Sequence, residues 1–156
     1  MTKTITPIVL AIWGKGGSGK TTTCISIASL AAAARSDLIA GSADLSLIVA
    51  RPNAFDLTLA LEWVGIVQRA GAAPLVALTA APPQRQGMLA PAVKAARTRL
   101  TKAGALVWSH QITQRQIHPE LIAGGLSVAD LPETALAHED YKRLWVSLCR
   151  REENNG

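Results

Sequence analysis

The sequence predicts one α/β domain in which a parallel sheet of about four strands is flanked by helices. Short apolar segments alternate with longer segments of helical periodicity, which is the order expected of a parallel sheet with helical crossovers. A glycine-rich loop over residues 14–22 joins the first apolar segment to the first helical one. The chain has 156 residues, of which 49% are hydrophobic and 17% charged, so it can bury a core of ordinary size.

The apolar segments and the helical repeats set the expected elements. Strands are expected near residues 7–13, 45–51, 74–80 and 105–109. The first helix follows the glycine-rich loop, and the others are expected over 57–71, 89–103 and 135–151. Residues 1–150 then form the domain, and the polar residues 151–156 are expected to be a frayed tail.

The loop between the first strand and the first helix has the spacing Gly-x-x-x-x-Gly-Lys-Thr, a complete Walker A phosphate loop. Its backbone N–H groups can turn inward around an anion, and the dipole of the following helix adds positive potential. Lys20 is expected to reach the β- and γ-phosphates, and the Thr21 hydroxyl to ligate Mg²⁺. The candidate phosphate-binding residues, called here the phosphate loop, are Gly14, Lys15, Gly16, Gly17, Ser18, Gly19, Lys20, Thr21 and Thr22.

The extra lysine, Lys15, makes this loop resemble the deviant Walker A box of the ParA/MinD family of dimerising ATPases. The resemblance implies a P-loop NTPase-like fold, ATP or ADP with Mg²⁺ as ligands, and a role for Lys15 at the phosphates of a partner subunit. Residues 43–57 are similar to the family's strand, proline turn and helix. Residues 113–128 are similar to the part of partition ATPases where an arginine, a short helix and a glycine precede the last helix.

The central region of that family has no counterpart in this sequence. Only a few residues separate the first helix from the strand that follows Asp44, so the switch segments and the Walker B aspartate are missing. Asp44 precedes its strand, Asp37 reads as a surface residue at a helix end, and Asp56 reads as the N-cap of a helix beginning at Leu57. Because nothing identified orients an attacking water, we expect nucleotide binding with weak or absent hydrolysis. Lys15 and Lys20 are the only candidate catalytic residues.

The position corresponding to the family's adenine-binding asparagine is occupied by Thr79. A hydroxyl offers less hydrogen bonding than an amide, so we expect poor base selectivity, with residues 80–84 still available to wrap the base. The three histidines are scattered, and none is assigned a catalytic role. The two cysteines lack metal or redox spacing and are expected to be buried.

The helix expected over 89–103 carries cations opposite its apolar stripe. The positive charge of this helix has the same sign as the formal net charge of the chain, which is +5. One interpretation is a solvated face that keeps the protein soluble, and the other is a surface for nonspecific DNA, as in partition ATPases. The cations, called here the basic face, are Lys94, Arg97, Arg99 and Lys102.

The strand that carries the phosphate loop would have an open edge without the missing region. Either residues 38–40 fold back as a short strand or a second chain pairs there, and we expect a homodimer. The first residues show no signal-peptide pattern, and no apolar run approaches the length of a membrane span. We therefore expect a cytoplasmic, nucleoid-associated protein that does not enter membranes.

Three functions fit the sequence to different degrees. The first is a nucleotide-binding protein of plasmid or chromosome partition that works with a ParB-like adaptor. The second is a nucleotide-independent DNA-binding or regulatory partner that keeps the fold. A small-molecule kinase is the third, but neither an arginine-rich lid nor a catalytic carboxylate is found.

Overall fold

The computed structural model describes residues 10–14, 18–33, 45–69 and 73–153. Strands and helices alternate along most of the chain, as the sequence predicts. The elements in chain order are β1 (Leu10–Trp13), α1 (Lys20–Ala33), β2 (Leu45–Ala50), α2 (Ala54–Arg69), β3 (Leu75–Leu78), α3 (Pro91–Lys102), β4 (Leu106–Val107), α4 (Ile117–Ala123), the 3₁₀ turn η1 (Val128–Asp130) and α5 (Leu136–Glu153).

The described strands form one small parallel sheet in the order β1-β2-β3-β4. Three of them are four to six residues long, and β4 has only two residues. The α/β class and the parallel sheet are therefore confirmed. Among the described strands β1 pairs with β2 alone, which puts the strand before the phosphate loop at an edge. Residues 38–40, expected to cover that edge, lie outside the described residues.

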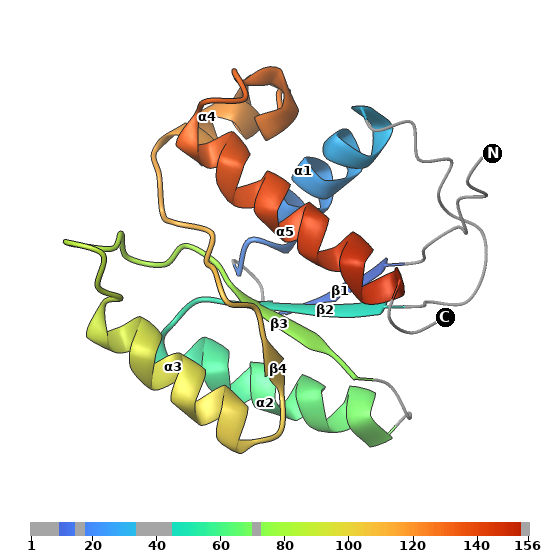
Figure 1. The fold of residues 1–156 in the computed structure, drawn as a ribbon, viewed down its shortest axis with the longest axis vertical. Coiled ribbons are helices and arrows are strands. Elements are labelled where there is room, and N and C mark those ends of the chain that lie inside the picture. The colour runs from blue at the N-terminus through green and yellow to red at the C-terminus, as the bar shows by residue number, and fades with distance from the viewer. Residues whose placement is uncertain (1–9, 15–17, 34–44, 70–72, 154–156) are drawn as a thin grey trace.

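Helices cover both faces of the sheet (Figure 1). On one face α1, α4, η1 and α5 pack over Leu47 and Val49, and on the other α2 and α3 pack over Ile48 and Ala50. Successive residues of β2 point to opposite faces, and these four are at most 1% exposed. A strand buried on both faces explains the unbroken apolar run in this part of the sequence.

The start of α2 corrects one expectation. The helix begins at Ala54, and Asn53 caps it, because the Asn53 Oδ1 accepts a hydrogen bond of 2.9 Å from the Asp56 N–H. The Asp56 carboxylate is buried in the first turn, where it accepts a hydrogen bond of 2.8 Å from the Arg51 Nε. Asp56 is therefore an ion-pair partner inside the helix and not the N-cap of a helix starting at Leu57.

The last two long helices follow the predicted apolar stripes. In α3, Val93, Ala96 and Leu100 are fully buried, and in α5, Tyr141 and Leu144 are buried against the same face of the sheet as α1. The burial expected for the cysteines is wrong: Cys24 is exposed and Cys149 half-buried. No helix in the described part of the chain is both long and apolar enough to cross a membrane.

Candidate functional site

The phosphate loop lies where β1 ends and α1 begins. Gly14 directly follows β1, and the Gly19 carbonyl accepts a hydrogen bond of 2.8 Å from the Thr23 N–H in the first turn of α1. The strand, loop and helix order required of a phosphate loop is thus present. Lys15, Gly16 and Gly17 lie outside the described residues, so the role expected for Lys15 stays a prediction.

Two of the glycines are required by their surroundings. A Cβ added to Gly14 would lie 2.5 Å from both the Val49 carbonyl oxygen and the Ser18 Oγ. Gly19 has a φ of +88°, a conformation that other residues rarely adopt. The loop is therefore packed directly against β2, and its entry into α1 depends on a left-handed residue.

Thr79, at the end of β3, is bonded to the phosphate loop. Its buried hydroxyl donates a hydrogen bond of 2.7 Å to the Ser18 carbonyl oxygen, across 61 positions of sequence. Thr79 therefore has a structural role, and its expected position near the base stays a prediction. This bond is not predictable from the sequence, because it depends on how β3 lies beside the loop.

The remaining described loop residues differ in exposure. Ser18 is 1% exposed, and its Oγ has no hydrogen-bond partner in the described part of the chain. Lys20 and Thr22 are half-buried, and Thr21 is exposed. An unpaired buried hydroxyl, a helix N-terminus and a loop that excludes a Cβ fit a bound phosphate.

A metal ion has weaker support. Thr21, the residue expected to ligate Mg²⁺, is exposed, and its role at a metal stays a prediction. However, the described residues contain no group of three or more His, Cys, Asp or Glu side chains that could hold a metal. A magnesium ion here would depend on Thr21 and on the phosphates themselves.

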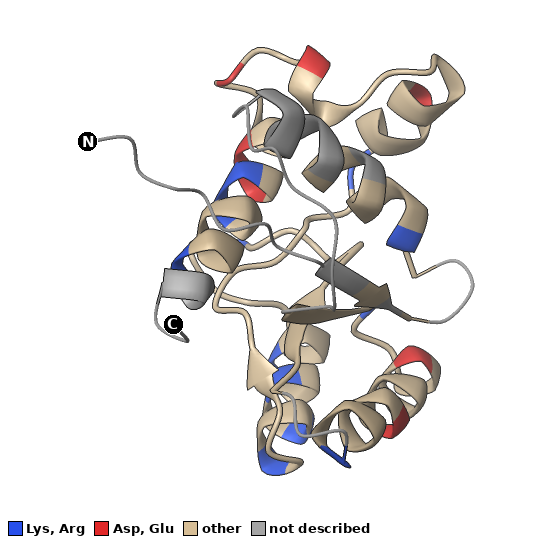
Figure 2. Cartoon of the chain, turned by 90° about the vertical axis from the view of Figure 1, so that its right-hand side faces the viewer, with Lys and Arg blue, Asp and Glu red and all other residues tan. Residues whose placement is uncertain are grey.

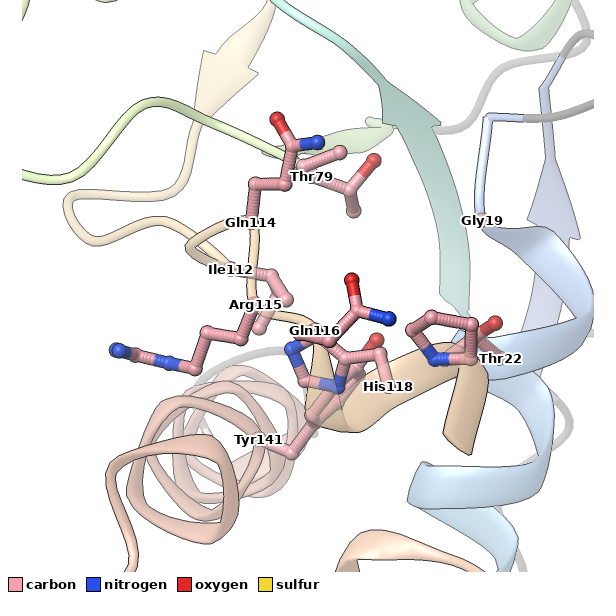
Figure 3. A pocket seen from close by; sticks show the side chains of 11 residues that line it. Gly19, Thr22, Thr79, Ile112, Gln114, Arg115, Gln116, His118 and Tyr141 are labelled. Carbon is pink, nitrogen blue, oxygen red and sulfur yellow. The ribbon is translucent and has the colours of Figure 1, made fainter. Parts of the chain in front are cut away.

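A cavity of about 300 Å³ adjoins the phosphate loop at the carboxyl ends of the strands. Figure 3 shows side chains from the first turn of α1, the end of β3, α4 and α5 arranged around it. Open α/β sheets bind ligands at this edge. The lining residues are Gly19, Thr22, Thr79, Ala80, Ile112, Gln114, Arg115, Gln116, His118, Pro119 and Tyr141.

Most residues of this cavity were not predicted from the sequence. The segment after β4 reaches it because Ala81 and Thr113 form a parallel bridge and the Gln114 N–H donates to the Ala81 carbonyl oxygen at 2.8 Å. The available signal was the loose similarity of residues 113–128 to partition ATPases. The short helix expected there is confirmed as α4, and His118 lies in its first turn and not in a loop.

His118 and Tyr141 form the aromatic side of the cavity. Their ring centroids are 5.8 Å apart at 83°, an edge-to-face arrangement. Burial lowers the pKa of His118, and the nearby Thr113 backbone and Asp140 only partly oppose this effect. Burial likewise raises the pKa of Tyr141, so both side chains are neutral near pH 7.

Among the described residues that line the cavity, Arg115 is the only Lys or Arg, and it pairs with the carboxylate of Asp140. Arg115 Nη2 donates to an Asp140 carboxylate oxygen at 3.1 Å, and the same oxygen accepts a hydrogen bond from the Thr113 N–H. Figure 3 shows the guanidinium of Arg115 directed away from Thr22 and Gly19. The pair fixes the start of α4 relative to α5.

The basic face lies on the other side of the sheet from α1, along α3 (Figure 1). Figure 2 shows blue segments and no red along this helix. Lys94, Arg99 and Lys102 are exposed, as predicted. Arg97 is half-buried, and its Nη2 donates to the His110 carbonyl oxygen at 2.6 Å, so its expected position on the open surface is wrong. Its burial lowers the pKa of the guanidinium, which stays charged at neutral pH.

Comparisons with known proteins add no relative. The chain matches no protein-family model, and a search of curated proteins finds no match. The similarity to the ParA/MinD family therefore depends on the loop residues and on the order of the later segments.

Proposed function

We propose that this protein is a ParA-like nucleotide-binding protein of a partition or positioning system, which binds ATP or ADP at its phosphate loop. The observation that carries the proposal is the junction of β1 and α1, where Gly14 and Gly19 adopt the close packing and the left-handed turn that a phosphate loop needs. The adjoining cavity supplies room for the rest of the nucleotide.

Each part of the loop has a binding role in this proposal. The N–H groups at the start of α1 donate to phosphate oxygens, and Lys20 neutralises their charge. A bound magnesium ion would add further neutralisation and would be held by Thr21. The Lys15 side chain of a partner subunit completes the site if the chain dimerises as members of the ParA/MinD family do.

Hydrolysis is expected to be weak or absent, because no described residue that lines the cavity is acidic. Acceleration of phosphoryl transfer to water requires a group that positions the water. Asp140 is the acid behind the cavity, and it is already bonded to Arg115 and to the Thr113 N–H. Binding, by contrast, needs only the loop and α1.

Calorimetric titration of ATP and ADP, each with Mg²⁺, tests the proposal. We expect micromolar dissociation constants that are lost in Lys20→Ala. Lys102→Ala is the matched control, since it removes the same charge from an exposed position on α3. Failure of both nucleotides to bind the wild-type protein would refute nucleotide binding.

The second candidate function, DNA binding without nucleotide, is favoured by the exposed cations of α3. Lys94, Arg99 and Lys102 have no acid on their own helix. Replacing all three with Gln should weaken binding to a random duplex and reduce its salt dependence. Lys142→Gln with Arg143→Gln is the control, because these exposed cations pair with acids. If ATP leaves this DNA affinity unchanged, the second candidate replaces the first.

The homodimer, the ParB-like adaptor and the cytoplasmic, nucleoid-associated location belong to the same proposal. The dimer is supported by β1, whose described pairing is with β2 alone. Gel filtration of the protein at high concentration, with light scattering to measure the mass, should give twice the mass of the monomer. A monomer under those conditions would count against the dimer and against the sharing of Lys15 between subunits.

A further inference from the structure

The cavity beside the phosphate loop has the size and the position for the nucleoside part of a nucleotide. Its volume of about 300 Å³ is at the lower end of small-molecule sites, which suits a base and sugar with the phosphates placed outside on the loop. Gly19 and Thr22 belong both to the loop region and to the cavity wall, so the two spaces are continuous.

Thr79 cannot supply a donor to a base in this cavity. Its single hydroxyl proton is used in the 2.7 Å bond to the Ser18 carbonyl oxygen, and the residue is 3% exposed. Ile112 and Ala80, the neighbouring wall residues, have apolar side chains. Base recognition must therefore come from the segment that includes α4.

Two glutamines of that segment present unused amides. Gln114 and Gln116 are exposed, and no described hydrogen bond involves either side-chain amide. Their backbones are nevertheless fixed: the Gln114 N–H bonds to Ala81, and Gln116 is the N-cap residue of α4 without a side-chain cap bond. In Figure 3 the Gln116 amide extends toward the space between Thr79 and Thr22, and the Gln114 amide lies beside Thr79.

The chemistry of an unused amide permits either purine. Adenine presents an amino donor beside ring acceptors, and guanine presents a carbonyl acceptor beside a ring N–H donor. A glutamine amide carries both an acceptor and donors, and rotation by half a turn exchanges them. Because neither amide is committed to a protein partner, this rotation breaks no described bond.

The aromatic side of the cavity adds contact area but does not distinguish one base from another. His118 packs edge-to-face against Tyr141, and the ring is neutral near pH 7 because burial lowers its pKa. A neutral imidazole offers a flat face on which any base can lie.

We propose that this cavity holds the nucleoside of a purine nucleotide and accepts adenine and guanine alike, with Gln114 and Gln116 as the base-contacting residues. The inference rests on the proposed binding of phosphates at the loop. It differs from that proposal in naming the ligand class and the residues that contact the base.

The test compares three probes by calorimetry, each with Mg²⁺: ATP, GTP and inorganic tripolyphosphate. ATP and GTP should bind within about 3-fold of each other, and both about 10-fold or more tighter than tripolyphosphate. Gln116→Leu should weaken ATP and GTP by about 5-fold and leave tripolyphosphate unchanged, and Gln114→Leu should act in the same direction. Gln68→Leu changes an exposed glutamine on α2, on the other face of the sheet from this cavity, and should leave all three probes unaffected.

Different failures have different meanings. Equal affinity for ATP and tripolyphosphate would overturn the base site while the phosphate loop stands. A preference for ATP over GTP above about 30-fold would overturn the shared recognition of purines. An unchanged affinity for ATP and GTP in the two glutamine variants would overturn the assigned residues, and failure of all three probes to bind would refute the proposed function itself.

Discussion

Replacing Thr79 with Val should loosen the phosphate loop without opening a cavity. Valine has nearly the shape of threonine, so the substitution removes the hydroxyl that donates to the Ser18 carbonyl oxygen and leaves the packing of the β3 end in place. Thr79 is 3% exposed and Ser18 is 1% exposed, so water does not readily replace the lost donor.

The magnitude follows from that burial. Leaving a buried carbonyl without its partner costs about 1–3 kcal/mol, and we take about 1.5 kcal/mol for one neutral bond of good length. In a domain of this size each kcal/mol corresponds to a shift of about 2–4 °C in Tm, so the expected loss is about 3–6 °C. If the freed loop is less often in its binding conformation, the affinity for ATP falls in the same proportion, up to about 10-fold.

Urea unfolding and ATP titration should be measured on the wild type, Thr79→Val and Thr79→Ser. Serine keeps the hydroxyl but loses a buried methyl group, which costs about 1 kcal/mol by itself. Stability should therefore fall in both variants, whereas ATP affinity should fall in Thr79→Val alone. Wild-type stability and ATP affinity within twofold of wild type in Thr79→Val would refute the anchoring role of this bond.

Three further outcomes are expected. Asp56→Asn should lower the free energy of unfolding by about 1–3 kcal/mol, because it breaks the ion pair between a buried carboxylate and Arg51. The control, Glu62→Gln on the exposed side of α2, should change the free energy of unfolding by less than about 0.5 kcal/mol. Both values are measured by urea titration. Gly14→Ala should abolish ATP binding, since a Cβ would lie 2.5 Å from a β2 carbonyl oxygen; ATP affinity equal to wild type in calorimetry would contradict this. Burial lowers the pKa of His118, so the unfolded chain takes up the proton at a higher pH than the folded one. The free energy of unfolding should therefore decrease as the pH falls below the ordinary pKa of histidine. Urea unfolding at pH 7.5 and 5.5 should show a smaller drop for His118→Asn, and an equal drop in both proteins would remove His118 as the cause.

The elements were predictable because their periodicity is local. The helical stripe of Val93, Ala96 and Leu100 is fully buried in α3, and the unbroken apolar run of β2 is buried on both faces. The phosphate loop was predictable for the same reason, since a Walker A spacing between a strand and a helix is contained in a few consecutive residues.

The errors concern residues whose role depends on distant neighbours. The hydrogen bond from the Thr79 hydroxyl to the Ser18 carbonyl oxygen was not predicted, although Thr79 does line the cavity beside the loop. Asp56 was expected to cap α2, but Asn53 offers an equivalent cap one turn earlier and leaves the carboxylate to Arg51. Propensity gives the kind of residue that caps a helix, and only the tertiary structure decides between two candidates three residues apart.

The cavity was missed for a related reason. Its walls come from four separate parts of the chain, and, apart from the phosphate loop and residues 79–84, only the loose similarity of residues 113–128 to partition ATPases pointed to any of them. The 111–114 segment reaches the phosphate loop through its bridge to Ala81, a contact between residues more than thirty positions apart. A single sequence carries no signal for such a contact.

The distribution of the cavity walls along the chain has a consequence for synthesis on the ribosome. The phosphate loop emerges early, but its anchor Thr79 and the cavity residue Tyr141 follow some sixty and one hundred and twenty positions later. If the loop and the cavity bind a nucleotide as proposed, a nascent chain would hold phosphate groups only weakly until β3 has emerged, and it could not enclose a nucleoside until α5 has folded onto α1. Nucleotide capture would then report completion of the whole domain, because the earliest residues of the site depend on the latest ones.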